Sequence, residues 1–530
     1  NHAYATGKVT GDALFGGLIG FNTASGTAAN SYWDSVTTGQ SSAAGGNGGG
    51  SVNVTMISGS SAYSHYSYAD LGTWNQAFGG AWVATDSSGQ TWVMFEESTR
   101  PFLYSEYSTS IKNAHQLQLM GLNITANYTL ANDINASATS GSNASSMWST
   151  QGFSPVGTNY GWEFTGSFDG QNHVISNLTI NKPTYDYVGL FGSAIGSTIS
   201  NVSLVGGSIV GQNYVGGLVG GLSGGTIENA HAGASVVGSY DVGGLIGINN
   251  GGTLNNVSAS GDVMGSSHDV GGLVGENWGN ISNAHATGNV MGTDTVYEQR
   301  VGGLVGYNGG SIENAYATGD VNADFGVGKA GGLVGVNDGA LTNVHASGQA
   351  NGYYAGGLVG ENWSDISNAY ATGNVAGAYA GGLIGDNNAN ITDSHASGNV
   401  TGLQDTYGGY VGGLIGLNGG DITRSYATGD VNGQASQYAG GLIGDNSGLI
   451  TDSYAQGKVT GGDDIYDYAG GLIGRNSWRI TGSYATGIVT GYYAGGLVGS
   501  SSNRITDSYA TGAVTGYYAG GLVGYSTNRI

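Results

Sequence analysis

The stretch Gly356-Gly357-Leu358-Val359-Gly360 is one copy of a phrase, Gly-Gly-Leu-Val/Ile-Gly, that recurs along most of this sequence. Successive copies start 25 to 31 residues apart. A repeat of this length is typical of a solenoid, in which each repeat is one structural unit that buries its apolar face by stacking on the next. The copies begin at Gly216, Gly243, Gly271, Gly302, Gly331, Gly356, Gly381, Gly412, Gly440, Gly470, Gly495 and Gly520.

One repeat, residues 356–380, predicts three short strands per coil. Leu358 lies in an apolar segment, Gly360-Glu361-Asn362 is typical of a turn, and Ile366 begins a second extended segment. From residue 369 onward, small or apolar residues alternate with Tyr, Thr and Asn, and this period of two separates a core face from a solvent face. We expect glycine-bearing corners, which tolerate positive φ angles, to join these strands. The predicted fold is all-β, a parallel β-helix with about one three-strand coil per 25–31 residues.

Equivalent positions should form columns, because stacked coils lie about 4.8 Å apart. The outward position next to the small inward residue is nearly always His, Ser or Tyr, which predicts an exposed aromatic column. Its members are His231, Ser258, His285, Tyr316, His345, Tyr370, His395, Tyr426, Tyr454, Tyr484 and Tyr509.

The turn after the phrase carries an Asn in every repeat from residue 249 to residue 476. Stacked Asn amides can bond to the same amide in the coils above and below, so we expect a structural ladder at this corner. The column consists of Asn249, Asn277, Asn308, Asn337, Asn362, Asn387, Asn418, Asn446 and Asn476.

A second tyrosine column lies just before the phrase, and Trp278 and Trp363 accompany it. Exposed aromatic rows suggest contact with sugar rings or with another rod, whereas the alternative is that the stacked tyrosines only stabilise the coils. The second column is Tyr354, Tyr379, Tyr410, Tyr438, Tyr468, Tyr493 and Tyr518. Both tyrosine columns are the candidate binding surface.

Composition excludes several functions. The net charge of −23 disfavours nucleic acid and anionic membranes as partners. The absence of cysteine excludes disulfides and thiolate metal sites, and no apolar run reaches the roughly 18 residues needed to span a bilayer. The chain begins and ends within a repeat phrase, so we expect it to be part of something longer.

Two metal-binding interpretations can be weighed. His231, His285, His345 and His395 alternate with other residues, so neighbouring histidines would lie about 9.6 Å apart, which is too far for one ion. The acidic insertion with Asp463, Asp464 and Asp467 could bind calcium, but it matches no established calcium-binding pattern, and a solvated loop is the simpler interpretation. No other cofactor is expected.

The chain divides into four parts. Residues 1–40 are the end of a preceding solenoid array, and residues 41–104 are a Gly/Ser loop followed by an aromatic capping segment that includes Phe78. Residues 105–187 are the lead-in coils of a second module, in which residues 116–120 could be helix or strand. Residues 188–530 are the repeat array.

The unit Gly-Gly-Leu-Val-Gly-x-Asn, followed by Ile-x-Asn-Ala-Tyr-Ala-Thr-Gly, resembles the GLUG-motif repeat of large bacterial surface proteins. These proteins are similar to filamentous-haemagglutinin-like adhesins exported by two-partner secretion. The resemblance implies a right-handed parallel β-helix, an extracellular or cell-surface location and an outer-membrane secretion partner. It carries no catalytic residues.

We therefore expect a rigid, non-enzymatic segment of an adhesin that contacts glycan, matrix, other cells or sister rods, with a role in attachment or biofilm. The alternative is a structural subunit of an extracellular filament. A polysaccharide lyase or hydrolase is a further possibility, but it would need convergent acids in a cleft, whereas the acids of this sequence are dispersed.

Overall fold

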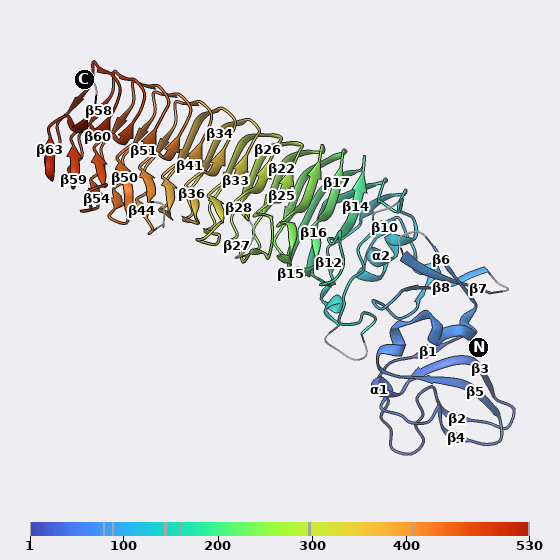
Figure 1. Cartoon of the computed structure of the whole chain (residues 1–530). Helices are drawn as coiled ribbons and strands as arrows, with labels where there is room; N and C mark the ends of the chain where they lie inside the picture. The colour runs from blue at the N-terminus through green and yellow to red at the C-terminus, as the bar shows by residue number, and fades with distance from the viewer. Residues whose placement is uncertain are drawn as a thin grey trace.

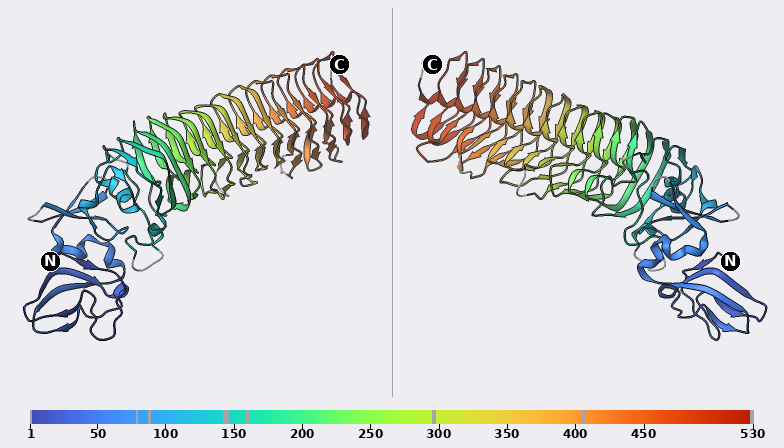
Figure 2. Two further views of the ribbon diagram at one scale, coloured as in Figure 1. Left: turned by 180° about the vertical axis from the view of Figure 1, so that it is seen from behind. Right: turned by 45° about the vertical axis from the view of Figure 1, so that its right-hand side comes forward.

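The computed structural model describes residues 2–77, 80–86, 89–141, 146–158, 161–294, 298–404 and 408–527, so Phe78 of the expected cap lies outside the described residues. The second half of the chain is a long rod of stacked coils, and smaller sheets lie at its N-terminal end (Figure 1). Two further views show the same elongated shape and regular coil stacking (Figure 2). No helix among the described residues is both long and apolar enough to cross a membrane.

One coil contains β38 (Ile366–Ala371), β39 (Val375–Gly377), β40 (Tyr379–Gly381) and β41 (Ile384–Asn387). Each pairs in parallel with its equivalent in the preceding coil, as when β38 pairs with β34 (Leu341–Ala346). Further along, the equivalents of β39 and β40 merge into one strand, β59 (Val489–Gly495). The coil therefore has three faces, and the prediction of a parallel β-helix is confirmed.

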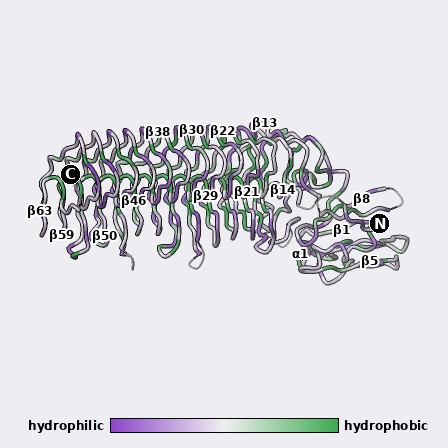
Figure 3. The backbone as a smooth tube through the Cα atoms, turned by 45° about the horizontal axis from the view of Figure 1, so that its top comes forward, coloured by the Kyte–Doolittle hydropathy of each residue, from purple (hydrophilic) through white to green (hydrophobic). Residues whose placement is uncertain are grey.

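The core consists of apolar side chains that repeat in every coil. Leu358, Val359 and Ile366 are at most 1% exposed, as are their equivalents throughout the interior of the array. The inward position beside the ring column is also buried, as at Ala369. Segments of similar hydropathy recur from coil to coil along the rod (Figure 3). Stacking therefore supplies the burial that one repeat cannot achieve alone.

The phrase glycines are needed for close approach between backbones. A Cβ atom on Gly356 would collide with the carbonyl oxygen of Val359, and one on Gly357 would collide with the carbonyl oxygen of Gly382 in the next coil. Neither glycine has a positive φ angle. The role of these two glycines is therefore steric. Positive φ at a corner glycine does occur at Gly224 and Gly251, with φ 63° and 80°, but not at Gly360.

The left-handed backbone lies two residues after the repeat isoleucine. Asn368 has φ 53°, Asp393 has φ 52° and Arg424 has φ 47°, and Gly482 occupies the equivalent position with φ 60°. Asn and Asp tolerate this region better than most residues because their short polar side chains can bond locally. The conformation explains why most repeats carry Asn or Asp at this position.

The Asn residues of the turn form one buried hydrogen-bonded column. Asn362 Nδ2 donates to Asn387 Oδ1 at 2.8 Å, and Asn362 Oδ1 accepts from Asn337 Nδ2 at 2.9 Å. Asn362 Nδ2 also donates to the carbonyl oxygen of Ser364 at 2.8 Å. The same pattern runs from Asn249 to Asn476. Each Asn side chain therefore hydrogen-bonds both to the Asn of the next coil and to a carbonyl group of its own turn.

The N-terminal segment forms a small parallel stack. Here β2 (Ile19–Asn22) pairs with β4 (Ala44–Asn47), while β3 (Thr27–Asp34) pairs with both β1 (Tyr4–Ala5) and β5 (Ser51–Ile57). The helix α1 (Ser35–Thr38) follows β3. Residues 41–57, expected to be a loop and the start of the cap, therefore include strands of a further coil. Asn22 Nδ2 donates to Asn47 Oδ1 at 3.3 Å, which repeats the Asn contact of the main array.

An antiparallel sheet separates this stack from the array. It consists of β6 (Thr73–Gln76), β7 (Ala81–Asp86), β8 (Gly89–Phe95) and β9 (Phe102–Leu103). Val83, Phe95 and Phe102 join the same apolar core as the array, so the sheet covers its first coils. Arg100 Nη2 donates to Asp34 Oδ2 at 2.6 Å, and this buried ion pair links the sheet to the N-terminal stack.

The lead-in coils contain α2 (Ala114–Leu119), so the ambiguous segment at residues 116–120 begins as a helix. Four strands then start the large ladder: β10 (Ser110–Ile111), β11 (Asn127–Leu130), β12 (Ile134–Asn135) and β13 (Ser167–Asn181). The helix lies beside these strands at the junction with the cap (Figure 1).

We predict that Asn362→Leu lowers the free energy of unfolding by about 2–4 kcal/mol, because Asn387 Oδ1, the carbonyl group of Ser364 and one N–H of the Asn337 amide each lose a buried hydrogen bond. Urea unfolding followed by circular dichroism measures the change. Asn388→Ala, at the exposed neighbouring corner position, is the matched control and should cost less than about 0.5 kcal/mol. Equal stability of Asn362→Leu and the wild type would contradict a ladder that stabilises the fold.

Candidate functional site

The first candidate surface is a continuous stack of rings, here called the Tyr/His column. Adjacent ring centroids are 4.6–5.2 Å apart and adjacent ring planes differ by 1–11°. The parallel register causes this arrangement, because it sets Tyr370 directly beside His345 and His395. The column contains His285, Tyr316, His345, Tyr370, His395, Tyr426, Tyr454, Tyr484 and Tyr509.

This geometry changes what the column can bind. A ring inside the stack, such as Tyr426, has a neighbouring ring against each face and is only partly exposed. Stacking on a sugar requires a free ring face, whereas these rings present edges, hydroxyl groups and imidazole nitrogens. Burial lowers the pKa of His345 and His395, which favours neutral imidazoles in the stack. The column is therefore a row of polar edges.

The second tyrosine column is less regular. Tyr468 and Tyr493 are stacked at 4.9 Å and 13°, whereas Tyr379 and Tyr410 meet edge to face at 5.1 Å and 82°. The same position in earlier coils carries charged residues, since Tyr354 is in register with Lys329, and Lys329 is in register with Arg300. The sequence analysis did not recognise this continuation.

A facing column on the neighbouring sheet carries complementary charges. Arg475 Nε donates to Asp445 Oδ1 at 2.8 Å, and its guanidinium lies 4.5 Å from the ring centroid of Tyr438. Lys329 Nζ contacts Glu361 and lies 3.1 Å from Glu298 Oε2. The contacts of Arg475 with Tyr438 and of Lys329 with Glu361 join the two columns, whereas Asp445 and Arg475 are neighbours within the facing column. The signal in the sequence was the variable residue of Val/Ile-Gly-x-Asn, which alternates among acidic, basic and apolar types.

Three carboxylates converge in the coils before this charged segment. Oxygens of Asp241, Asp269 and Glu276 lie within 4.8 Å of one another, a spacing at which carboxylates can ligate a cation. Arg300 donates from Nη2 to Asp269 Oδ2 at 2.6 Å and supplies a positive charge there. Burial raises the pKa of Asp269 to about 7, and burial with the neighbouring Asp269 and Glu276 also raises the pKa of Asp241. The charged forms of these acids are therefore disfavoured in the native state.

The acids first considered for calcium lie elsewhere. Asp467 Oδ2 accepts the backbone N–H of Asp464 at 3.0 Å within the insertion loop, so at least one carboxylate oxygen there closes the local turn. Asp463, Asp464 and Asp467 also line a surface hollow of about 670 Å³ together with Gln404 and Gln434. Calcium at this loop stays a prediction.

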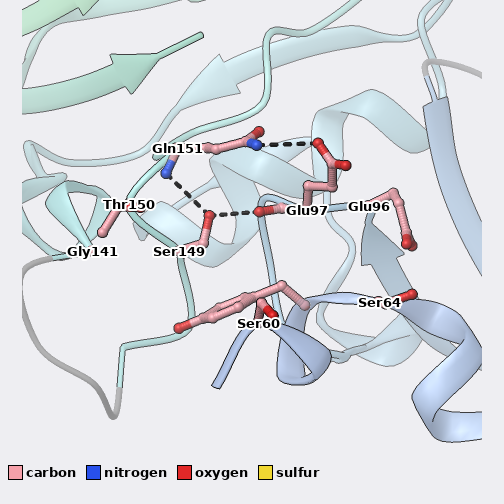
Figure 4. Close-up of a pocket in the computed structure, with 9 residues that line it drawn as sticks. Ser60, Ser64, Glu96, Glu97, Gly141, Ser149, Thr150 and Gln151 are labelled. Atoms are coloured by element: carbon pink, nitrogen blue, oxygen red, sulfur yellow. Dashed lines mark hydrogen bonds between the residues drawn. The ribbon is translucent and has the colours of Figure 1, made fainter. Parts of the chain in front are cut away.

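A polar cavity of about 650 Å³ lies between the antiparallel cap and the lead-in coils (Figure 4). Gln151 Nε2 donates to Glu97 Oε2 at 3.1 Å, and Ser149 Oγ donates to the carbonyl oxygen of Glu97 at 2.6 Å. The second carboxylate, Glu96, lies 2.7 Å from His65 Nδ1. Both acids therefore make contacts that fasten the cap, and they do not converge as a general acid and base would.

We predict that the buried acids of the array contribute less stability as pH rises from about 5 to about 8. Burial and the nearby Glu361 raise the pKa of Asp386 to about 6, while Asp269 titrates near 7. An unfolded Asp titrates near 3.9, so over this range these carboxyl groups bind more protons in the native state than in the unfolded state, and their contribution to stability falls with pH. The lowered pKa of His345 and His395 acts in the opposite direction, so the acids are tested by comparing a variant with the wild type. Thermal unfolding midpoints measured at several pH values test this.

Asp241→Asn removes one of the three converging charges and should raise the midpoint at pH 8 while changing it little at pH 5. An Asp241→Asn midpoint that differs from the wild-type midpoint by the same amount at pH 5 and at pH 8 would contradict the assignment of raised pKa values to these acids.

Comparison with known proteins gives one family match and one curated relative of note. The model of the GLUG motif matches residues 266–291, 297–322, 351–376, 407–432 and 490–515. Halomucin from Haloquadratum walsbyi (strain DSM 16790 / HBSQ001) is 35% identical over 198 residues, which cover 33% of this chain and 2% of halomucin. The chain thus spans only a small part of that relative's length.

Two solved structures are also similar. A Bacteroides ovatus protein assigned as an immunoglobulin A1 protease has a TM-score of 0.26 and 17% identity, covering 68% of this chain and 76% of that one. An IgA1 protease has a TM-score of 0.17 and 13% identity, covering 76% of this chain and 26% of that one. These scores are too low to carry an argument about activity. The sequence match is the informative one, and the repeat array of this chain is a β-solenoid that contains five GLUG motifs.

Proposed function

We propose that the chain is a stiff segment of an extracellular surface protein, which attaches to glycan, matrix or other cells through repeated contacts on its outer faces. The GLUG motifs and the similarity to part of halomucin support an extracellular repeat protein. The resemblance to two-partner-secretion adhesins supports export through an outer-membrane partner. The segment catalyses no reaction in this proposal.

The observation that carries the proposal is the Tyr/His column. Its nine rings present polar edges at intervals of 4.6–5.2 Å, and the backbone ladder holds them in place. Individual contacts with such edges are weak, but many contacts on one rigid partner add by avidity. Because the edges are held in place, little side-chain entropy is lost on contact.

The net charge of the chain limits the kinds of polymer to which it can bind. The net charge of −23 repels nucleic acid and strongly acidic polymers. Association of sister rods into a filament is the alternative, and the second tyrosine column offers a surface for it.

We predict that combining Tyr370→Ser, Tyr426→Ser and Tyr454→Ser weakens attachment to cells or matrix by about ten-fold or more, because it interrupts the row of edges at three coils. Biolayer interferometry with immobilised cell-surface material measures this. A second variant replaces the same residues with Phe, which keeps the stack and removes only the hydroxyl groups, and it should also weaken attachment if the hydroxyl groups make the contacts. Unchanged attachment of the Ser variant would sink this mechanism, and concentration-dependent sedimentation of the wild type would favour the filament.

A further inference from the structure

Two tryptophans on one corner of the rod are more exposed than the rings inside the Tyr/His column. Trp278 is 49% exposed and Trp363 is 56% exposed. Both follow a buried Asn of the ladder within the same four-residue sequence, Gly-Glu-Asn-Trp, at residues 275–278 and 360–363. The indole therefore leaves the coil at a position whose backbone is fixed by the Asn contacts.

Each indole is fixed in orientation by the preceding acid. Trp278 Nε1 donates to Glu276 Oε1 at 2.7 Å, and Trp363 Nε1 donates to Glu361 Oε1 at 2.8 Å. Glu361 is in turn held by Lys329 and only 12% of its side chain is exposed. Since the ring orientation is set before any partner arrives, binding costs little side-chain entropy.

One side of the Trp278 indole rests on the next coil. A Cβ atom on Gly309 would collide with this ring, so the indole lies against the glycine backbone, and Tyr307 packs at a tilt with centroids 5.2 Å apart. About half of the side chain stays exposed on the outside. Trp278 thus offers the apolar ring surface that the stacked tyrosines do not.

The two tryptophans occupy equivalent positions three coils apart. The backbone N–H of Trp278 donates to the carbonyl oxygen of Asn249, and that of Trp363 donates to the carbonyl oxygen of Asn337. The Asn register from 277 through 308 and 337 to 362 gives three strand intervals, or about 14 Å. The equivalent positions in the two coils between them carry Gly309 and Asp338, whose side chains are smaller than an indole.

We infer that Trp278 and Trp363 are the two platforms of a binding site for an uncharged or amine-bearing glycan chain lying along this corner of the rod. The C–H faces of pyranose rings pack on exposed indoles, and the exposed carboxylate of Asp338 accepts hydrogen bonds from sugar hydroxyl or ammonium groups, with Glu276 and Glu361 adding negative charge beside the indoles. The same carboxylates repel sulfated or uronate-rich chains. The inference rests on the proposed attachment function and names its partner class.

The test is isothermal titration calorimetry of the full chain with β-linked glucose and N-acetylglucosamine oligosaccharides, mannose and glucosamine oligosaccharides, and a sulfated oligosaccharide. We expect at least one uncharged or amine-bearing tetramer to bind, the matching disaccharide to bind about ten-fold more weakly because it cannot span both indoles, and the sulfated probe not to bind. Binding of none of the uncharged or amine-bearing probes, or preference for the sulfated one, overturns the inference.

Variants distinguish the loss of an indole contact from a general effect on the fold. Trp278→Ala and Trp363→Ala should each weaken binding by about ten-fold or more, as expected for a central aromatic contact. Gly309→Val, which displaces the Trp278 indole without deleting it, should act in the same direction. Trp478→Ala is the matched control, since Trp478 is 52% exposed but lies one residue further from its ladder Asn, and it should change binding less than two-fold. Circular dichroism checks that each variant is folded.

Attachment assays on the same variants distinguish this inference from the function on which it rests. If Trp278→Ala combined with Trp363→Ala keeps both glycan binding and attachment, the platform assignment is wrong and the attachment function stands. If the wild type attaches to no surface, the proposed function fails, and glycan binding that depends on both tryptophans would still support the site. Equal losses in Trp478→Ala would overturn the two-platform site.

Discussion

The parallel register between coils is the constraint on which the other features depend. Backbone hydrogen bonds place each residue beside its equivalent one repeat away, as Tyr370 lies between His345 and His395. Any side chain in the array must therefore be compatible with a near copy of itself at about 4.8 Å. Asn satisfies this condition because its amide both donates and accepts, and aromatic rings satisfy it by stacking. Like charges repel at this spacing, which is consistent with charged residues being only 9% of the chain. Where they do stack, as Arg300 and Lys329 do, each also contacts an acid.

The same constraint restricts how the rod can recognise a partner. Where the Tyr/His column repeats without interruption, each ring face packs against the neighbouring ring, so only the ring edges are exposed. Binding chemistry that needs an open surface must come from positions where repetition is broken, and Trp278 next to Gly309 is such a position. The acids at Asp241, Asp269 and Glu276 illustrate the cost of placing charge in such a position, because burial, together with the neighbouring acids, raises the pKa of both aspartates.

Much of the fold could be predicted from the sequence because the same residue pattern recurs in each repeat. The interval of the Gly-Gly-Leu phrase indicates the solenoid, and the invariant turn Asn indicates a buried amide ladder. Features without repetition were harder to predict. The coil containing β4 is too rich in glycine to resemble a strand, although Asn22 and Asn47 are 25 residues apart, as in the array. The antiparallel cap depends on contacts between segments that show no periodicity, and the charged face depends on residues from two different sheets.

The most direct test of a one-coil-per-repeat rod is small-angle X-ray scattering of the purified chain. The sheet containing β41 has thirteen strands, so at about 4.8 Å per coil the array alone extends roughly 60 Å, with the lead-in coils and the N-terminal sheets adding to it. The structure predicts a skewed pair-distance distribution with a long tail and a radius of gyration well above the roughly 24 Å expected for a compact domain of this length. A symmetric distribution with a radius of gyration near that compact value would contradict the stacked-coil architecture.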